Sequence, residues 1–233
     1  MKKCFMFAVM PVLLFTTFAL AAPPDDQKAV FTTDLKHVMA TQLSPHITPP
    51  AKEDAGLNII AGNFSRYPDA TYFCIWGNTI AQGGSNFPFQ TWVAVAFTPT
   101  ANATITRLEV SAGRQGGGTA GYELGLYSDD NGLPGALIKG GHVSNIPPYG
   151  ECCQFASLND PAGVPVTAGT QYWVAVTTTP EDTDIYAWAY NSTNMTPQLA
   201  ASWCEGSSTY CGANSGKWVS LQYVQFGFQV LGH

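Results

Sequence analysis

Charged side chains are scarce in this 233-residue sequence, in which Asp, Glu, Lys and Arg together make up only 11%. Sixteen of them are acidic and ten are basic, which gives a formal net charge of −6. Nucleic acids and anionic membranes both select for basic patches, and a sequence this poor in Lys and Arg offers none. We therefore expect no nucleic-acid partner.

The motifs of common metal and hydrolytic sites are also missing. No two of the four histidines have the spacing of an HExxH zinc motif, and no GxSxG nucleophile elbow occurs. The glycine-rich residues 113–118 lack the Lys-Ser/Thr ending of a phosphate-binding loop. The sequence therefore predicts a non-enzymatic protein without a cofactor. The scattered histidines are His37, His46, His142 and His233.

Long apolar runs are limited to one, residues 5–20 at the N-terminus. Lys2 and Lys3 precede it and Ala19 and Ala21 close it, which is the pattern of a cleaved secretory signal. The run is shorter than the roughly 20 residues that a membrane-spanning helix needs. We expect residues 1–21 to be removed, leaving a secreted or periplasmic protein with no membrane insertion.

Residues 22–56 form a separate, proline-punctuated stretch. Within residues 26–43 the apolar side chains recur at helical spacing. We predict a short amphipathic helix or a disordered leader for this stretch. The apolar residues at this spacing are Val30, Phe31, Leu35, Val38 and Met39.

From residue 57 to residue 233 the apolar pattern changes to a period of two. Residues 93–97, 122–126, 172–176 and 224–230 alternate in this way, as strands with one buried face do. Turn signals separate the runs at short intervals, and no helical segment long enough for a parallel crossover is present. The sequence predicts an all-β, antiparallel sandwich of the jelly-roll kind.

Four segments carry a resemblance to a known family: residues 92–97, 126–135, 168–174 and 226–230. Together they resemble bacterial secreted β-sandwich domains of the choice-of-anchor type, over roughly residues 70–231. The resemblance implies the sandwich fold and export, and it carries over no catalytic residues. A C-terminal sorting tail is lacking, because the chain ends at Leu231-Gly232-His233. We therefore expect free secretion or a periplasmic location instead of surface anchoring.

Five cysteines remain after Cys4 leaves with the signal, and cysteines outside the cytoplasm usually pair. Cys204 and Cys211 bracket a turn-rich loop that one disulfide would close. Cys74 could pair with either Cys152 or Cys153, whose side chains point to opposite faces if they lie in a strand. The odd count leaves one thiol over, or a strained vicinal bridge.

Structural calcium is the metal that the sequence favours most, because carboxylate and amide oxygens are abundant. Two acidic loops are the candidates, although an ordinary Asp-Asn-Gly turn also explains the first of them. The candidate ligands are Asp129, Asp130, Asn131, Glu181, Asp182 and Asp184.

Aromatic side chains are the most suggestive feature for binding. Tyr186, Trp188 and Tyr190 share one face of a predicted strand, where exposed rings would form a platform for stacking sugars. The alternative is that this face is the core, since large aromatics are more often buried. Trp203 and Tyr210, in or beside the predicted disulfide loop, are secondary candidates.

These features favour a secreted, non-enzymatic binding or surface-associated module whose partner is a glycan or a cell-surface protein. One alternative is a carbohydrate-active hydrolase, which needs two carboxylates roughly 5–9 Å apart. Glu109 and Glu123, on the outward faces of consecutive predicted strands, are the pair that could approach each other. A structural envelope protein without a small ligand is the other alternative.

Overall fold

The computed structural model describes residues 38–39, 56–64, 72–83, 88–115, 121–148, 155–182, 184–191, 198–224 and 226–233. Strands dominate these ranges, in which the only helical segments are the short α1 (Ser208–Cys211) and the 3-10 turn η1 (Gly212–Asn214). No helix within them is long and apolar enough to cross a membrane. The predicted all-β class is confirmed.

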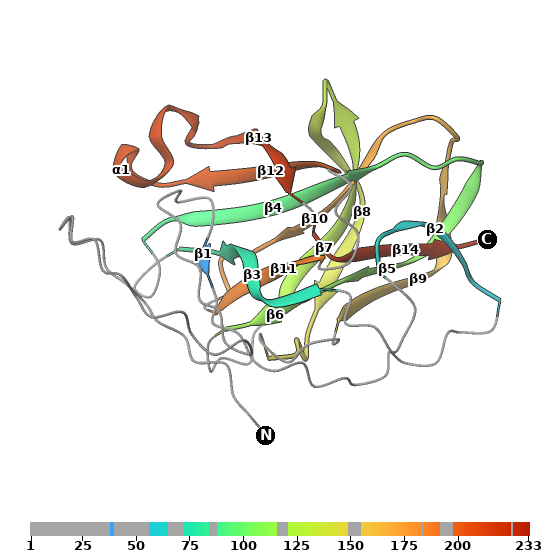
Figure 1. Ribbon diagram of the computed structural model, residues 1–233, viewed down its shortest axis with the longest axis horizontal. Coiled ribbons are helices and arrows are strands. Elements are labelled where there is room, and N and C mark those ends of the chain that lie inside the picture. Colours follow the sequence, from blue (N-terminus) through green and yellow to red (C-terminus); the bar gives the residue numbers. More distant parts are fainter. Residues whose placement is uncertain are drawn as a thin grey trace, which may run out of the picture.

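The larger of two sheets holds ten strands of the described chain. These are β1 (Val38–Met39), β3 (Tyr72–Ala81), β4 (Gln90–Phe97), β6 (Ala112–Arg114), β7 (Tyr122–Asp130), β8 (Leu133–Val143), β10 (Tyr172–Thr177), β11 (Ile185–Asn191), β12 (Gln198–Glu205) and β13 (Lys217–Val224). Its main path runs β6-β11-β3-β4-β10-β7-β8 (Figure 1). Off this path, β1 pairs with β3, and β12 pairs with both β4 and β13.

The smaller sheet holds four strands, β2 (Asn58–Gly62), β5 (Ala103–Val110), β9 (Ala156–Val166) and β14 (Phe228–Gly232). Its order is β2-β14-β5-β9, and the pairs of named strands in both sheets are antiparallel within the described ranges. The sheets pack face to face as the predicted sandwich, with more strands than the eight of a simple jelly roll.

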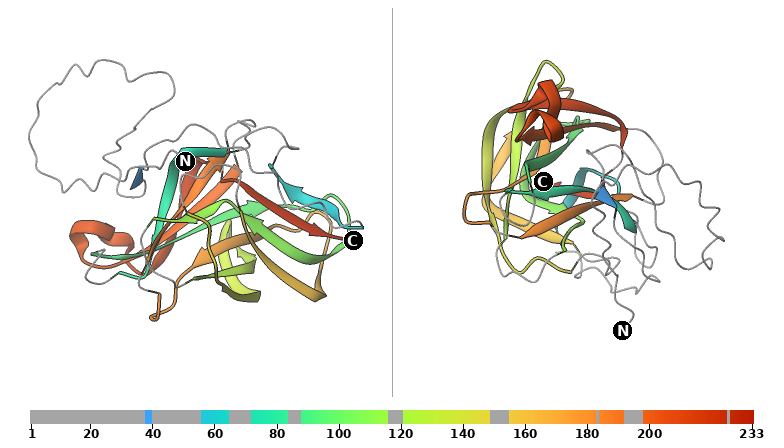
Figure 2. Two further views of the ribbon diagram at one scale, coloured as in Figure 1. Left: turned by 90° about the horizontal axis from the view of Figure 1, so that it is seen from below. Right: turned by 90° about the vertical axis from the view of Figure 1, so that its left-hand side faces the viewer.

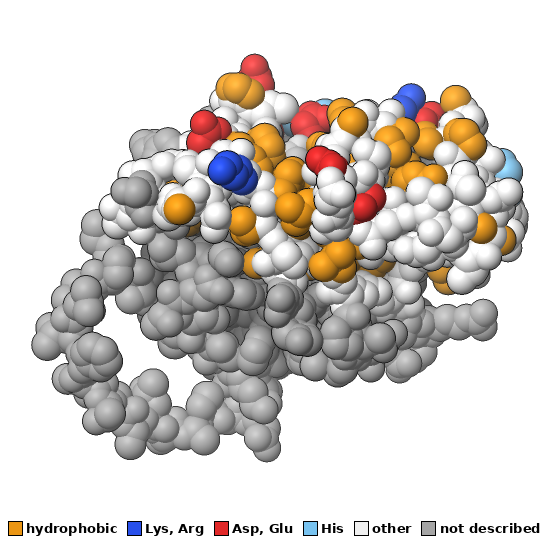
Figure 3. Space-filling model, turned by 90° about the horizontal axis from the view of Figure 1, so that it is seen from above, with side chains coloured by type: hydrophobic (Ala, Val, Ile, Leu, Met, Phe, Trp, Pro, Cys, Tyr) orange, Lys and Arg blue, Asp and Glu red, His pale blue; other side chains and the backbone are white. Residues whose placement is uncertain are grey.

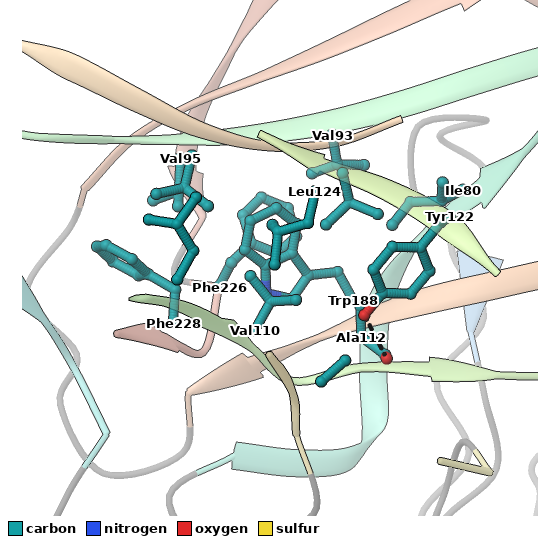
Figure 4. Packing of buried hydrophobic residues seen from close by; sticks show 14 of the residues in the cluster. Ile80, Val93, Val95, Val110, Ala112, Tyr122, Leu124, Trp188, Phe226 and Phe228 are labelled. Carbon is teal, nitrogen blue, oxygen red and sulfur yellow. Dashed lines mark hydrogen bonds between the residues drawn. The ribbon is translucent and has the colours of Figure 1, made fainter. Parts of the chain in front are cut away.

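The core between the sheets is built by alternate residues of each strand, as the period of two requires. Val93 and Val95 of β4 meet Val110 and Phe228 of the smaller sheet (Figure 4). Tyr122 also lies in this core, where its hydroxyl donates to the carbonyl of Ala112 at 3.1 Å (Figure 4). Because β-branched and aromatic side chains fill this space, the other face of β4 is left with Gln90, Trp92, Ala94 and Ala96.

The β7–β8 hairpin is closed by a two-residue turn. Asn131 and Gly132 both have positive φ angles, 54° and 82°, and Asp130 faces Leu133 across the turn. Asn-Gly is the preferred pair for such a turn, because Gly tolerates positive φ without cost and Asn does so more readily than most residues. The predicted Asp-Asn-Gly turn is thus present.

Beyond this turn the hairpin bends over the sheet. The β7–β8 register shifts twice, and β8 contacts β10 and β13, neither of which is its hydrogen-bonded neighbour. In Figure 1 the hairpin, in yellow-green, rises above β4 near the end of β13. We call the face of the larger sheet that points away from the core between the sheets the outer face. Leu133 of β8 and Trp218 of β13 both pack against a second, smaller buried cluster on this face, which includes Trp173.

At the N-terminal side, Val38 and Met39 form β1 and pair with Gly77 and Trp76 of β3. The amphipathic helix expected across residues 26–43 is wrong at these two positions, because their backbones hydrogen-bond to a sheet edge. The rest of that stretch, and the predicted signal at residues 1–21, lie outside the described residues.

Candidate binding face

The predicted aromatic platform on β11 is wrong as an exposed site. Tyr186 and Trp188 both have 0% exposed surface. Tyr186 packs edge-on against Tyr122, with ring centroids 5.2 Å apart, and Trp188 packs against Phe226 at 4.9 Å. These two side chains belong to the core that joins the sheets. The side chain of Tyr190 lies outside the described residues.

The polar atoms of these two core rings have partners in the backbone. The Tyr186 hydroxyl donates to the Gly121 carbonyl at 2.7 Å, and Trp188 Nε1 donates to the Gly227 carbonyl at 2.8 Å. Burial, together with the carboxylates of Asp182 and Asp184, raises the pKa of Tyr186 well above its ordinary value. Both rings are fixed parts of the fold.

A different set of aromatic residues lies on the outer face. Trp203 of β12 stands directly opposite Trp92 of β4 on one side and Trp218 of β13 on the other. All three side chains are partly exposed. We call these three residues the tryptophan row. Of the earlier secondary candidates, Trp203 is therefore part of an aromatic surface, whereas the side chain of Tyr210 lies outside the described residues.

The rings of the row are held against one another. Trp92 and Trp203 stack with centroids 4.0 Å apart and planes 14° apart, and Trp218 is tilted by 46° to Trp92 at 6.4 Å. Both Trp203 and Trp218 therefore pack against the ring of Trp92.

Across the sheet the row continues as polar residues. Thr177 of β10 lies one residue beyond the last β10–β4 pair, and it stands opposite Glu123 of β7. Glu123 in turn stands opposite His142 of β8, and its Oε1 lies 3.0 Å from His142 Nδ1. The outer face thus carries one line of side chains across six strands, aromatic at one end and polar at the other.

The next line of residues along the strands has only small side chains. Gly125 and Gly140 face each other, and the line passes from Gly125 through the alanines to Ser220 on β13. The three alanines have no exposed surface, because the rings of neighbouring lines lean over them. The alanines are Ala94, Ala175 and Ala201.

The missing side chain at Gly125 leaves room for the ring of Tyr127. A Cβ atom at Gly125 would lie 2.9 Å from Tyr127 Cε2, so the tyrosine ring lies against the bare glycine. Burial raises the pKa of Tyr127, a hydrogen bond with the Thr177 side chain lowers it, and the nearby charge of Glu123 raises it. Tyr127 therefore connects the small-residue line to the polar end of the row.

A polar network borders the row on the side of β3. Trp92 Nε1 donates to Thr178 Oγ1 at 2.8 Å, and Thr178 Oγ1 donates to Gln82 Oε1 at 2.8 Å. Gln90 Nε2 donates to the same oxygen at 2.5 Å. Glu205, which is exposed, stands opposite Gln90 at the end of β12. Amide and carboxylate groups able to bind hydroxyls therefore lie within one residue pair of the tryptophans.

The predicted disulfide between Cys204 and Cys211 is confirmed, with Cα atoms 5.5 Å apart. It closes the loop between β12 and β13, which contains α1 and projects at one end of the molecule (Figures 1 and 2). The loop is also tied by hydrogen bonds from Gly216 N to the Cys204 carbonyl at 2.7 Å and from Ser215 Oγ to the Gly206 carbonyl at 3.1 Å. The disulfide thereby fixes the ends of β12 and β13, which carry Trp203 and Trp218.

The other cysteine prediction cannot be followed in the structure. Cys152 and Cys153 lie outside the described residues, and only the backbone of Cys74 is described, in β3. The pairing of Cys74 with either of them stays a prediction.

The first acidic loop uses its carboxylates to hold the fold. Asp129 Oδ1 accepts hydrogen bonds from Trp173 Nε1 at 2.8 Å and Gln171 Nε2 at 2.5 Å, and its Oδ2 accepts from Gly132 N at 3.0 Å. Desolvation raises the pKa of Asp129, but these hydrogen bonds outweigh it and the pKa is lowered. Asp130 accepts from the side chain of Asn131.

The acidic side chains of the second loop differ in their exposure to solvent. Glu181 is exposed, whereas Asp182 and Asp184 are buried. Asp182 accepts from Thr179 N at 2.6 Å, and Asp184 lies 3.9 Å from Arg114 Nε. No group of three or more His, Cys, Asp or Glu side chains suited to a metal ion occurs in the described ranges. Calcium binding by either loop stays a prediction.

The carboxylates proposed for a hydrolase, Glu109 and Glu123, do not form a pair. Glu109 lies on β5 of the smaller sheet, where it is 4% exposed and lies 2.8 Å from Arg107 Nε. Glu123 lies on the outer face of the larger sheet. The expectation was wrong because consecutive strands were assumed to share a sheet, whereas the chain crosses from one sheet to the other between β5 and β7.

Comparison with known proteins adds no functional information. No family model matches this chain, and a search of curated proteins finds no match either. The resemblance to choice-of-anchor domains therefore stays a prediction.

Two residues of the tryptophan row, Trp92 and Trp218, were missed as candidates in the sequence. The signal for Trp92 was its alternation with Val93 and Val95, whose β-branched side chains mark the core face. The signal for Trp218 was the disulfide, because a bridge that closes a hairpin places the residues flanking it on opposite strands. Trp203 precedes Cys204 directly, so its partner lies shortly after Cys211.

Proposed function

We propose that this protein is an exported, non-enzymatic module that binds carbohydrate through the tryptophan row. The observation that carries the proposal is the register of Trp92, Trp203 and Trp218, three partly exposed tryptophans side by side on one sheet face. Figure 3, seen from the side where β12 and β13 lie in Figure 1, shows hydrophobic side chains gathered in patches with acidic groups between them. Such a surface marks an interaction site more often than a bare solvent face.

The chemistry of the row fits a sugar. A sugar ring has an apolar C–H face that packs on an aromatic ring, and its hydroxyl groups need polar partners. Thr177 and Glu123 continue the row beyond Trp92, so a sugar packed on the partly exposed tryptophans would have polar side chains beside it. Gln82 and Gln90 lie on the neighbouring side, where Thr178 already orients the indole.

Export is part of the proposal. The N-terminal pattern at residues 1–21 is that of a secretory signal, and the Cys204–Cys211 disulfide is compatible with an oxidising compartment outside the cytoplasm. A membership of the choice-of-anchor type would agree with both. Extracellular and periplasmic proteins meet polysaccharides directly, which agrees with a glycan ligand.

The test is a binding screen against neutral polysaccharides and oligosaccharides, with the full chain produced in an exporting host, in calcium and in chelator. We expect saturable binding that Trp203→Ala weakens by at least about tenfold, or ~1.4 kcal/mol. The fold should survive this change, because the Trp203 side chain lies outside the core between the sheets. Loss of binding in chelator alone would add a calcium requirement to the proposal.

The matched control is Ile59→Ala, which removes an exposed apolar side chain from β2 of the smaller sheet. This variant should bind as the unaltered protein does. Binding that survives Trp203→Ala, or an absence of binding to every glycan tested, would overturn the proposal and leave a protein partner or a structural role.

A further inference from the structure

The ionisable Asp, Glu, Lys, Arg and His side chains that the described strands place on the outer face are all carboxylates, except for one histidine. Along the six strands from β13 to β8, Glu123, Glu205 and Asp129 are the carboxylates of this face within the described residues. Lys139 and Lys217 are the only Lys or Arg residues in those strands as described. Neither basic side chain belongs to the outer face.

The two lysines are accounted for by the sheet geometry. Lys139 reaches the other sheet, where its Nζ lies 3.2 Å from Asp160 Oδ2 of β9. Lys217 stands opposite Cys204, one position away from the Trp218–Trp203 pair, and successive side chains of a strand point to opposite faces. A ligand on the tryptophan row therefore meets carboxylates and no Lys or Arg side chain from these strands. The histidine of this face, His142, lies with its Nδ1 3.0 Å from Glu123 Oε1.

The carboxylates lie close to the aromatic rings. Glu205 follows Trp203 by two residues on the same face of β12, a separation of about 7 Å along a strand. Glu123 lies two strands from Trp92 in the polar end of the row, a separation of about 10 Å across a sheet. Two carboxylates thus border the aromatic surface from different directions, at a spacing that an oligosaccharide can span.

We infer that the ligand is a glycan built from amino sugars with free, protonated amino groups. The inference rests on the proposed carbohydrate binding and adds the ligand class. Ammonium groups on such a glycan would meet Glu123 and Glu205, and they are also attracted to the ring faces of tryptophan. The same carboxylates repel uronic-acid and sulfated glycans.

The experiment compares β-linked glucosamine oligomers with N-acetylglucosamine oligomers of the same length, at a pH where the free amines are protonated. We expect about tenfold tighter binding of the glucosamine oligomer at low salt, and a smaller difference at high salt because ions screen the attraction. A polygalacturonate oligomer, which is anionic, should bind more weakly than either.

Charge variants test the residues themselves. Glu123→Gln and Glu205→Gln should each weaken glucosamine-oligomer binding by about two- to fivefold, as expected for charge pairs at a protein surface. They should weaken binding of the acetylated oligomer less, because the Gln amide can still hydrogen-bond a sugar hydroxyl. Asp130→Asn is the matched control, because it removes a carboxylate at the β7–β8 turn, away from the row. It should change neither affinity.

The outcomes separate the inference from the proposed function. Equal, Trp203-dependent binding of the two oligomers, or a glucosamine preference that survives both Glu variants, would overturn the inference and leave carbohydrate binding intact. Binding of neither oligomer, together with failure of the neutral-glycan screen, would overturn both. Oligolysine binding as tight as that of the glucosamine oligomer and unaffected by Trp203→Ala would show simple charge attraction, and would also overturn the inference.

Discussion

Two groups of tryptophans in the larger sheet have opposite environments. Trp188 on β11 is fully buried against the smaller sheet, whereas Trp92, Trp203 and Trp218 are partly exposed on the outer face. Both groups lie on strands with clear alternation. The difference comes from what occupies the alternate positions.

The residues that alternate with the tryptophans differ in size between β4 and β11. On β4 they hold Val93 and Val95, which fill the core and leave Trp92 outside. On β11 they hold Ala187 and Ala189, which are buried yet too small to fill the space between two sheets. The large aromatics of β11 therefore take that space. On these two strands the aromatic residues face the core only where the alternate positions are small. Trp173 of β10 lies on the outer face and is still fully buried, so an outward-facing ring is exposed only where nothing else packs over it.

The loss of stability should be greatest when the buried tryptophan is removed. Trp188→Ala should lower the free energy of unfolding by about 3–5 kcal/mol, because it opens a cavity and leaves the Gly227 carbonyl without its indole donor. Urea unfolding followed by circular dichroism measures this. Trp203→Ala, on the exposed side, should cost about 1 kcal/mol through the lost stacking on Trp92.

Equal stability losses in the two variants would contradict this division. That result would mean that the tryptophan row is as important to folding as the core, and a loss of glycan binding in Trp203→Ala would then say nothing about a binding surface.

A smaller effect is expected from the disulfide that holds the exposed side. Replacing Cys204 and Cys211 by Ser should lower stability by roughly 2 kcal/mol, since the bridge closes a loop with a sequence separation of only 7. Glycan binding should weaken as well, because Trp203 and Trp218 lie on the arms next to the bridge. Thermal unfolding and binding assays on the double variant measure the two effects.

The buried tryptophan provides the control for the disulfide variant. The NMR signal of the Trp188 indole N–H should be unchanged, because no residue of this loop belongs to the buried cluster that contains Trp188. A variant that keeps full glycan affinity would show that the sheet alone positions the row.

The sequence allowed the strands, the sandwich and this disulfide to be predicted, because each depends on local pattern. Alternation at residues 93–97 and 172–176 and the Asn131-Gly132 turn are such patterns, and the structure places strands and a hairpin turn there. Which face of an alternating strand is buried depends on the other sheet. The platform on Tyr186 and Trp188 was wrong for that reason.

Which strands pair when they lie far apart in the sequence also could not be predicted. The tryptophan row joins β4, β12 and β13, and β12 reaches β4 across about a hundred residues of chain. Glu109 and Glu123 are close in sequence but lie in different sheets. Sequence proximity gave the wrong pair of carboxylates, and only the sheet order places Glu123 in line with Trp92.

The two fully buried tryptophans, Trp188 and Trp173, also differ in the acceptors of their indole N–H groups. The core Trp188 donates to a neutral carbonyl, whereas the buried Trp173 of the outer face donates to the carboxylate of Asp129. The pKa of Asp129 is lowered in the folded protein, so its charge contributes stability above the ordinary Asp pKa of about 3.9. That contribution is lost as the pH falls through the lowered, folded-state pKa.

Asp129→Asn should therefore be less stable than the unaltered protein near neutral pH, by under about 1 kcal/mol because the carboxylate is exposed. The difference should shrink below about pH 4, since the unaltered protein then also loses the charge. Thermal unfolding from neutral to acid pH measures it, with Asp130→Asn as the control that removes a neighbouring charge without touching the indole. A difference that stays constant across this range would show that Asp129 acts through shape alone, and that the two buried tryptophans are held in the same way.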